Sequence, residues 1–290
     1  ISAALYAVRG NLDPLVINNG IGALEKAEKI ENYYGLEHPL SGQELYDTGI
    51  AQAKALGVRM LDAQVLGVGG FDTFVVKTTE GEFETQSLIL ATGSKRAAPK
   101  IPGVKEFEGR GVSYCAICDA FFYRGKDVAV LGNGDFAMHE AKELANTAST
   151  VTIYTNGEEP EFTLEGNISV NTMKIQSVEG DELVSGIRLA PDMQAQETDS
   201  DSEKAVGEFC HADGLFIAMG TAGSTEIARQ MGAELTEKGN ILVNENMETT
   251  IPGLYAAGDC TGGLLQVAKA VCDGAQAGIN AGKYVRSLNK

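Results

Sequence analysis

The sequence predicts an α/β protein with parallel sheets covered by helices on both faces and with one domain inserted into another. Three observations predict it. Apolar strand-like segments alternate with helical segments, and glycine is frequent, at 35 of 290 positions. The segments also follow the order of one strand–helix unit, a second such unit and then a return. Alternation predicts parallel, covered sheets, and frequent glycine fits the tight turns between strands and helices. A hydrophobic content of 43% suits one large or two medium domains.

The N-terminal third predicts two helices and a strand. Residues 1–10 (ISAALYAVRG) are typical of a helix already under way, and residues 14–18 (PLVIN) of a short buried strand. Residues 39–57 predict an amphipathic helix that begins at Ser41, because their apolar residues recur near helical spacing.

A hairpin and a complete strand–turn–helix–strand unit follow. Residues 71–93 alternate and turn at Glu80-Gly81, which predicts a hairpin that continues into the apolar strand SLILATG. Residues 126–155 then contain a strand, a glycine turn (GNGDFA), a helix and a second strand. A further ladder of strands is interrupted by the acidic segment 190–209, which predicts a solvent loop.

The C-terminal part returns to apolar strands and ends in a long helix. Residues 212–220 predict a buried strand, and residues 239–259 a strand, a turn and another strand. A helix is expected from about 265 to 288.

Composition excludes several classes of function. A formal net charge of −17 argues against a nucleic-acid partner, which needs clustered Lys and Arg. No apolar run reaches the length of a membrane span, and no signal peptide is visible. The odd, sparse set of cysteines is not a secreted disulfide framework, so the cytosol is the expected compartment. The cysteines are Cys115, Cys118, Cys210, Cys260 and Cys272.

Cys115 and Cys118 form a C-x-x-C pair with three interpretations. Zinc needs four ligands, and the other close cluster, Cys210-His211, is poorly spaced for one tetrahedral centre. Two buried thiols without a function are a second interpretation. A redox pair is favoured, because C-x-x-C at a helix start lowers a thiol pKa and Asp119, the next residue, can exchange the protons of a dithiol–disulfide cycle.

At this point the chain resembles the low-molecular-weight thioredoxin reductase family of flavoproteins over nearly its whole length. The order and spacing of the motifs carry the resemblance rather than any single motif. The motifs are ENYYG (31–35), LILATGS (88–94), GRGVSYCAICDAFFYRGKDVAVLGNGD (109–135), GLFIAMG (214–220), TTIPGLYAAGDCTGG (249–263) and LQVAKAVCDGAQAG (265–278).

The resemblance implies two Rossmann-like domains of the FAD/NAD(P)-binding, three-layer type, with a homodimer as the assembly. One domain would bind FAD and contain both ends of the chain, residues 1–108 and 239–290. The other, residues 109–238, would be inserted, carry the disulfide and correspond to the pyridine-nucleotide domain.

The resemblance also implies roles for individual residues. Cys118 would face the flavin and take its electrons, Cys115 would attack the disulfide of the protein substrate, and Asp119 would be the general acid–base. The residues expected to contact FAD are Asn32, Ala91, Thr92, Gly93, Gly258, Asp259, Gln266 and Val267. Among them, Gln266 and Val267 open the last helix, whose positive end would stabilise the reduced ring.

Two departures from the family pattern matter. First, the FAD-binding Gly-x-Gly-x-x-Gly turn, which lies before the first helix in the family, is absent from the chain. A longer protein with about fifteen to twenty more residues in front is expected, by the usual size of a strand and turn. The alternative is that a chain without this turn cannot hold FAD.

Second, the NADPH site is poor. After the second strand the family places arginines that grip the 2′-phosphate, whereas this chain reads YTNGEEPEF (154–162). Glu158, Glu159 and Glu161 would repel a phosphate, and the charge-assisted bonds of arginine are lost. NADH does not fit well either, because its carboxylate position holds Thr155 and Asn156. Strand–helix packing alone, without a bound nucleotide, is a sufficient reason for the chain to keep the glycine turn GNGDFA.

These departures resemble a branch of the family that takes its electrons from ferredoxin and keeps FAD and the C-x-x-C pair. In that interpretation ferredoxin reduces FAD in two one-electron steps, the flavin reduces the pair, and the dithiol reduces thioredoxin. Basic candidates for a ferredoxin dock, each equally consistent with scattered solubilising charge, are Lys95, Arg96, Lys100, Lys105, Arg110, Arg124 and Lys126.

Three alternatives stay open, and a fourth is disfavoured. An NADPH-dependent thioredoxin reductase with a divergent cofactor site is one, and a related disulfide oxidoreductase with a second flavin is another. A redox-sensing or zinc-holding module without flavin is the third. A ferredoxin–NADP reductase of the same fold is disfavoured, because that group lacks the C-x-x-C pair. No role is assigned to Cys210, Cys260 and Cys272, which are expected to be small core residues.

Overall fold

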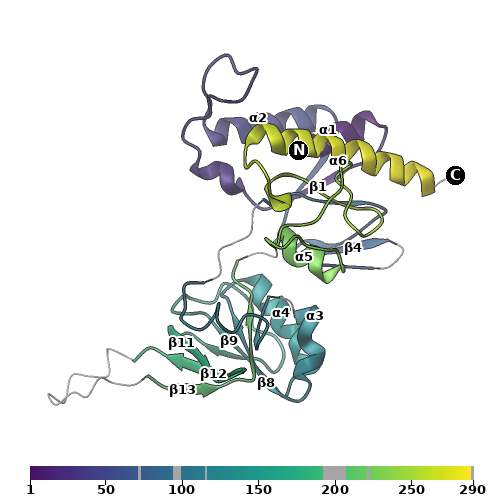
Figure 1. Ribbon diagram of the computed structural model, residues 1–290. Coiled ribbons are helices and arrows are strands. Elements are labelled where there is room, and N and C mark those ends of the chain that lie inside the picture. Colours follow the sequence, from purple (N-terminus) through teal and green to yellow (C-terminus); the bar gives the residue numbers. More distant parts are fainter. Residues whose placement is uncertain (71–72, 94–98, 115, 192–206, 221–222, 289–290) are drawn as a thin grey trace. The chain divides into compact units, whose positions relative to one another are not determined.

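The chain divides into two compact units (Figure 1). The computed structural model describes residues 1–70, 73–93, 99–114, 116–191, 207–220 and 223–288. Unit 1 joins both ends of the chain, Ile1–Arg96 with Ala222–Lys290, and unit 2 is Ala97–Thr221. One unit is therefore inserted into the sequence of the other.

The unit boundaries differ from the predicted ones, which were 1–108 with 239–290 around 109–238. Val104 and Phe107 are buried in the hydrophobic core of unit 2. Ser224, which begins a helix of unit 1, shares a short hydrogen bond with Thr92 of the same unit. Both boundaries thus depend on side-chain packing, which the motif pattern does not reveal.

The described residues of unit 1 form helices and three small sheets. Its described helices are α1 (Ser2–Arg9), α2 (Gly42–Ala55), α5 (Ser224–Gln230) and α6 (Val267–Leu288), with 3-10 turns η1 (Gly22–Lys26) and η3 (Gly258–Thr261). Its described strands are β1 (Leu15–Asn18), β2 (Arg59–Asp62), β3 (Val65–Gly69), β4 (Phe74–Thr78), β5 (Gly81–Thr85), β6 (Leu88–Leu90) and β15 (Leu254–Ala256). β1 pairs with β2 and β15 with β6 in parallel, while β3, β4 and β5 are antiparallel.

Local sequence explains the main elements of unit 1. Ser41 caps α2 in a capping box with Glu44, as the predicted helix start requires. The predicted hairpin is present, but its turn is Thr79-Glu80, one residue before the predicted Glu80-Gly81, because Gly81 already pairs with Thr78 as the first residue of β5. α1 packs along α6, and the two lie side by side in Figure 1. Glycine permits this approach, because a Cβ on Gly278 would lie 2.3 Å from the Ala3 carbonyl oxygen.

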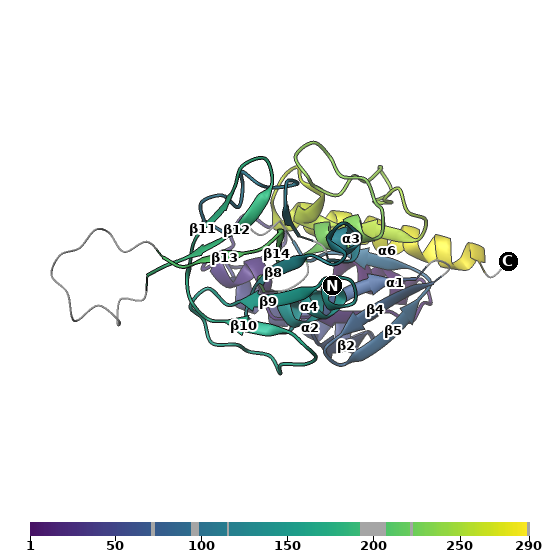
Figure 2. The ribbon, with the colours of Figure 1, turned by 90° about the horizontal axis from the view of Figure 1, so that it is seen from below.

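Unit 2 is built around a parallel five-stranded sheet in the order β10-β9-β8-β14-β7, of which Figure 2 labels the first four strands. Its strands are β7 (Val112–Ser113), β8 (Asp127–Leu131), β9 (Thr150–Tyr154), β10 (Ser169–Asn171) and β14 (Gly214–Ile217). α4 (Asp135–Ala145) packs on β8 and β9, and α3 (Ala116–Asp119) with the 3-10 turn η2 (Ala120–Tyr123) precedes β8. An antiparallel sheet of β11 (Ile175–Gly180), β12 (Val184–Leu189) and β13 (Phe209–His211) completes the unit.

Most predicted elements are present, with one correction. The first strand expected in residues 239–259 is absent: Ile241 makes only an isolated bridge to Leu235, and the strand that forms there is β15. The acidic loop predicted over 190–209 lies mostly outside the described residues, and its last residue begins β13. No helix among the described residues has the length and apolar character needed to cross a membrane.

Candidate active site and cofactor site

The helix α3, which follows β7, begins at Ala116 and contains Cys118, the second cysteine of the pair. Cys115 is outside the described residues, and Cys118 is placed by its backbone in α3. Asp119, the proposed acid–base, ends the same turn, and its Oδ2 accepts a 2.6 Å hydrogen bond from Ser113 Oγ. The link ties the carboxylate to β7 and fixes where it can exchange a proton.

Glu140 of α4 is a site residue that the motif analysis missed. Its Oε2 accepts a 2.6 Å hydrogen bond from the backbone N–H of Ala116, the first of the two residues between the cysteines. Glu140 is only 1% exposed, and its Oε1 has no hydrogen-bond partner among the described residues. Burial raises the pKa of Glu140 to about 7; the Ala116 bond opposes that rise and the charge of Glu143 adds to it.

A signal for Glu140 was present in the sequence. Phe136, Ala137, Ala141 and Leu144 are the buried apolar face of α4, and Glu140 lies four residues from both Phe136 and Leu144. A carboxyl on the apolar face of a helix is expensive unless it is bonded or protonated. It therefore indicates a special environment.

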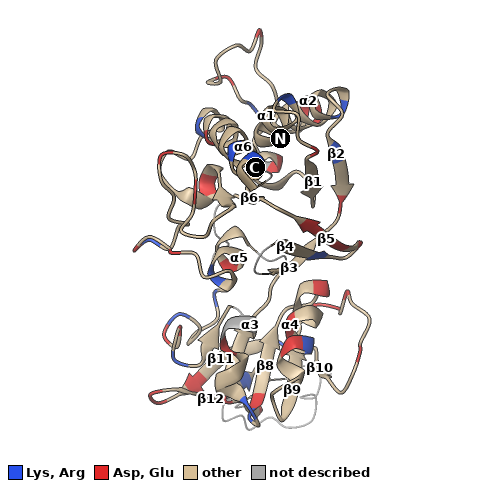
Figure 3. Cartoon of the chain, turned by 90° about the vertical axis from the view of Figure 1, so that its right-hand side faces the viewer, with Lys and Arg blue, Asp and Glu red and all other residues tan. Residues whose placement is uncertain are grey.

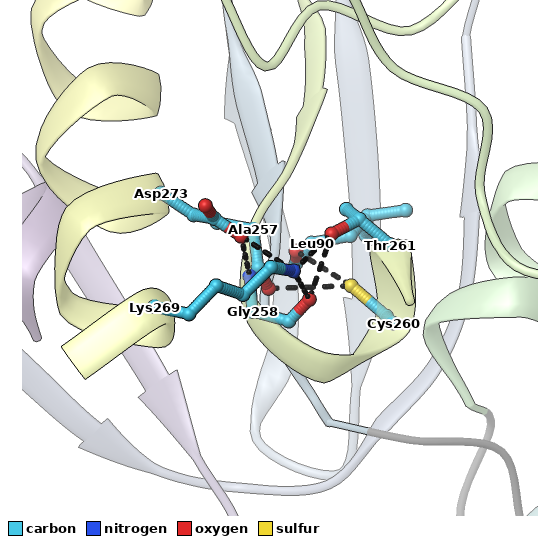
Figure 4. A network of polar contacts seen from close by, with 7 residues as sticks. All are labelled: Leu90, Ala257, Gly258, Cys260, Thr261, Lys269 and Asp273. Carbon is cyan, nitrogen blue, oxygen red and sulfur yellow. Dashed lines mark hydrogen bonds and ion pairs between the residues drawn. The ribbon is translucent and has the colours of Figure 1, made fainter. Parts of the chain in front are cut away.

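On unit 1 the predicted residue Gly258 belongs to a polar network with Thr261, Lys269 and Asp273, three residues that the sequence motifs had not indicated (Figure 4). Gly258 has a φ of +81°, which favours glycine, and its N–H donates to Asp273 Oδ2 at 3.1 Å. Lys269 Nζ donates to the Gly258 carbonyl oxygen at 2.8 Å and to Thr261 Oγ1 at 2.6 Å, and lies 2.7 Å from Asp273. The network fixes both polar groups of Gly258 from α6.

Asp259 lies next to this network and keeps its carboxylate available. The residue is half-buried, and within the described part of the chain its side chain accepts no hydrogen bond. A braced turn with an unused carboxylate fits a site that accepts a hydroxyl from a sugar or ribityl chain. Asp259 would hold that hydroxyl of FAD.

The other predicted cofactor residues belong to the same unit. Thr92 and Ser224 exchange hydrogen bonds, with 2.6 Å between their hydroxyl oxygens and 3.0 Å from Thr92 N to Ser224 Oγ. Ala91 and Thr92 are exposed, and Gly93 has a φ of +88° with no atom near its missing Cβ. Asn32 Nδ2 donates to Gln266 Oε1 at 3.0 Å, and Val267 begins α6 as predicted. The exposed groups could hold FAD, and α6 could direct its positive end at an anionic ring.

The glycine turn of unit 2 follows β8, as predicted, but the segment after β9 folds back onto it. The backbone N–H of Glu161 donates to the Asn133 carbonyl oxygen at 2.7 Å. Thr155 Oγ1 donates to the Glu158 carbonyl oxygen at 2.5 Å, which holds the segment in a turn. A dinucleotide would need its phosphates beside this glycine turn and the start of the following helix.

Gly132 has a packing reason that does not involve a ligand. A Cβ there would lie 2.2 Å from the Ala218 carbonyl oxygen and 2.8 Å from the Ala137 Cβ. Glycine is therefore needed for β8, β14 and α4 to pack. The turn by itself does not require a bound nucleotide.

The remaining cysteines differ in environment. Cys260 is buried, its thiol hydrogen-bonds the Ala257 carbonyl oxygen at 3.3 Å, and burial raises its pKa to about 11, so it is a protonated core residue as expected. Cys210 is half-buried. Cys272 is exposed on α6, so its predicted place in the core is wrong. The helix turns Cys272 outward while Asp273, the next residue, faces the buried network.

Comparison with known proteins identifies the family and the fold. Residues 1–274 match the pyridine nucleotide-disulphide oxidoreductase family. Thioredoxin reductase from Aquifex aeolicus is 34% identical, with 100% of this chain and 91% of the relative covered, and that from Treponema pallidum is 35% identical, with 99% and 94% covered.

Solved structures agree. The atypical thioredoxin reductase TRi from Desulfovibrio vulgaris Hildenborough has a TM-score of 0.88 and 37% identity, with 99% of this chain and 94% of that chain covered. A ferredoxin-flavin thioredoxin reductase from Clostridium acetobutylicum has a TM-score of 0.68 and 28% identity, with the same coverage.

The fold and the cofactor site define an FAD-binding α/β protein of two Rossmann-like units. The chain belongs to the pyridine nucleotide-disulphide oxidoreductase family, and its homologues include low-molecular-weight thioredoxin reductases. These proteins bind FAD, which confirms the expected fold class and cofactor.

Proposed function

We propose that this protein reduces the disulfide of thioredoxin through FAD and the Cys115–Cys118 pair, with reduced ferredoxin as the electron donor. FAD would pass electrons to the pair, and unit 1 would hold it through the residues named above. In unit 2, Cys118 would receive the electrons, Cys115 would attack the disulfide of the substrate, and Asp119, tied to Ser113, would exchange the proton.

A protein substrate is supported by the surface beside the pair. Phe121 and Phe122 follow α3 and are 69% and 68% exposed. Arg124 lies over the Phe121 ring, with 5.6 Å from Cζ to the ring centre, and Lys126 over the Tyr123 ring at 5.5 Å. Exposed aromatic residues with adjacent cations are typical of an interaction surface. Such a surface fits a folded partner better than a small disulfide.

The observation that favours ferredoxin over a pyridine nucleotide as the electron donor is the hydrogen bond from Glu161 N–H to the Asn133 carbonyl oxygen. It brings the segment 155–161 back over the turn that a pyridine nucleotide would occupy. Glu158, Glu159 and Glu161 are exposed there, and Asp135 in the first turn of α4 adds negative charge where phosphates would lie. The likeness to the ferredoxin-flavin enzyme of Clostridium acetobutylicum supports the same donor.

A ferredoxin dock would need basic residues on an acidic chain. Lys100, Lys105, Arg110, Arg124 and Lys126 are exposed, whereas Lys95 and Arg96 lie outside the described residues. Lys and Arg are spread over both units in Figure 3 rather than gathered in one patch. The dock is therefore expected to be small, and its contribution to fall as salt screens it.

The same proposal places the protein in the cytosol as a homodimer. It assigns FAD to the unit that contains both chain ends and the redox pair to the inserted unit. Sedimentation of the flavin-loaded protein tests the dimer.

The test follows the flavin absorbance of the complete protein, purified without oxygen. NADPH, NADH and reduced ferredoxin are each added to separate samples, and thioredoxin reduction is then measured. Bleaching by ferredoxin alone is expected. Fast bleaching by NADPH would refute the ferredoxin assignment and indicate a conventional donor, and two flavins per chain would indicate a second flavin in the unit 2 site.

A charge-reversal variant separates the two reasons for an absent nucleotide site. Glu158→Arg/Glu159→Arg removes the repulsion but keeps the backbone bond from Glu161 to Asn133. The segment is expected to keep excluding NADPH in this variant. Bleaching of the variant by NADPH would show that charge alone excludes the nucleotide.

A further inference from the structure

A buried carboxyl is bonded to the backbone of Ala116, a residue that lies between the two cysteines in the sequence. Glu140 reaches from α4 to the Ala116 amide with one oxygen, 2.6 Å away, while its second oxygen is buried and unbonded among the described residues. Ala116 is covalently joined to Cys115. Any change in the charge or position of Glu140 therefore acts within one peptide unit of the cysteine that would attack the substrate.

Folding alone gives no reason for a carboxyl at this place. α4 is otherwise apolar on this face, and Glu140 is as buried as its neighbours. A glutamine could accept the same hydrogen bond without the penalty for burying a charge. Unlike glutamine, the glutamate that is present can gain or lose a proton.

The chemistry of the pair supplies a use for that property. The thiolate is the reactive form of cysteine, and negative charge nearby disfavours it. An ionised Glu140 adds such charge and occupies the Ala116 N–H, which could otherwise stabilise a thiolate. The two anions therefore exclude each other, and their titrations are coupled.

We propose that Glu140 is a proton-linked positioning residue of the Cys115–Cys118 pair, which orients the Ala116 amide and gains a proton when a thiolate forms in the pair. The inference rests on the proposed function, because it assigns the pair a redox role. The balance is simple: the thiol loses one proton, Glu140 gains one, and the local charge stays at one negative. When the thiolate is consumed in disulfide exchange, Glu140 releases its proton.

Other titratable groups near Glu140 are few. The elements packed against α4 carry Asp119 and Cys118 on α3, Asp127 on β8 and Tyr154 on β9. On α4 itself the nearest are His139 and Glu143. Of these, Glu143 contributes to the raised pKa of Glu140, whose main cause is burial.

The test measures thiolate formation directly in the flavin-loaded protein. The pair is reduced with a phosphine, and the rate of alkylation by iodoacetamide is followed from pH 5.5 to 9 by the mass of the peptide that contains the pair. Two inflections are expected for the wild-type chain, one from each coupled group. Glu140→Gln is expected to show one inflection and to react at least about threefold faster at pH 8, which corresponds to half a pKa unit.

Glu143→Gln is the matched control, because it removes one charge from the next turn of the same helix. It is expected to keep both inflections. A Glu140→Gln profile that equals the wild-type profile, or a Glu143→Gln profile with the same single inflection, would overturn the proposal.

A second measurement does not use Glu140→Gln, so it tests the proposal even if that variant fails to fold. The infrared difference between dithiol and disulfide forms is recorded for the wild-type protein and for Asp119→Asn between pH 6 and 8. A protonated carboxyl that appears on reduction in both proteins supports Glu140, and its absence from either overturns the inference. Neither assay needs ferredoxin or thioredoxin. A pair that cannot be reduced and reoxidised would instead refute the proposed function.

Discussion

Lys269→Met is expected to destabilise unit 1 by about 2 kcal/mol. Lys269 and Asp273 are 20% and 10% exposed at their side chains, and they lie 2.7 Å apart. Removing one partner of a fully buried pair costs about 3–5 kcal/mol, and an exposed pair contributes less than about 1 kcal/mol. The partial exposure here places the cost between these limits.

The structure shows which groups bear this cost. Without Lys269 the Asp273 carboxylate keeps a hydrogen bond from Gly258 N–H but loses its cation. Thr261 Oγ1 still donates to the Gly258 carbonyl oxygen at 2.8 Å, so that oxygen stays bonded. The loss is therefore mainly that of an uncompensated, half-desolvated charge beside the turn that would hold FAD.

Urea unfolding followed by circular dichroism, with flavin fluorescence as a measure of FAD release, tests this. Lys283→Met is the control, since Lys283 is exposed on the same helix and donates a hydrogen bond to Asn280 of that helix. Lys269→Met/Asp273→Asn is expected to recover at least half of the loss, because it removes the unpaired charge. A Lys269→Met chain no less stable than Lys283→Met would refute the reasoning, and so would a double variant that is no better than the single one.

Three further predictions follow from the site and the core. Cys118→Ser is expected to keep FAD and lose disulfide reduction, measured by thioredoxin-dependent turnover against flavin content; unchanged turnover would contradict the mechanism. Burial raises the pKa of Glu140 to about 7, so the folded chain holds this proton more tightly than the unfolded chain. The free energy of unfolding is therefore expected to fall by about 3 kcal/mol as pH rises from about 4.5 through 7. Urea unfolding of Glu140→Gln should therefore be flatter than wild type from pH 5 to 8, and parallel curves would disprove it. Gly103→Ala should lower the free energy of unfolding by about 3 kcal/mol, because φ is +89° and a Cβ would lie 2.1 Å from the Val178 carbonyl oxygen. Gly109→Ala, at φ +73° with open space around the Cβ, should lower it by about 1 kcal/mol. Equal losses for the two variants in urea unfolding would contradict the predicted clash.

Local signals predicted most elements because each element depends on residues close in sequence. Ser41 and Glu44 complete a capping box three residues apart, and the hairpin predicted to turn at Glu80-Gly81 turns one residue earlier between adjacent strands. The strand–turn–helix–strand unit of 126–155 likewise appears as β8, α4 and β9. Such features need no knowledge of distant packing.

The features that were missed depend on contacts between distant segments. Val104 belongs to unit 2 because it packs in that unit's core, and the segment near Ile241 forms only a bridge because it pairs with Leu235 alone. Glu140 acquires its role through Ala116, which lies in a different element. Lys269 and Asp273 were passed over for a similar reason, since a pair four apart on a helix usually lies in solvent, whereas here Gly258 holds it in the interior.

The glycine turn shows why one motif supports opposite conclusions. From sequence, GNGDFA after a strand is compatible with a nucleotide site, and the glutamates that follow argue against it only through charge. In the structure Gly132 is required by the Ala218 and Ala137 contacts, so the motif would persist without any ligand. Nucleotide binding at this turn is opposed by the backbone as well as by charge, because a main-chain hydrogen bond from Glu161 holds the segment on Asn133. Packing alone maintains this motif, and a following segment of the chain is bonded to it, so the motif does not indicate a bound nucleotide. The electron donor is therefore expected to be a molecule other than a nucleotide bound at the glycine turn of unit 2.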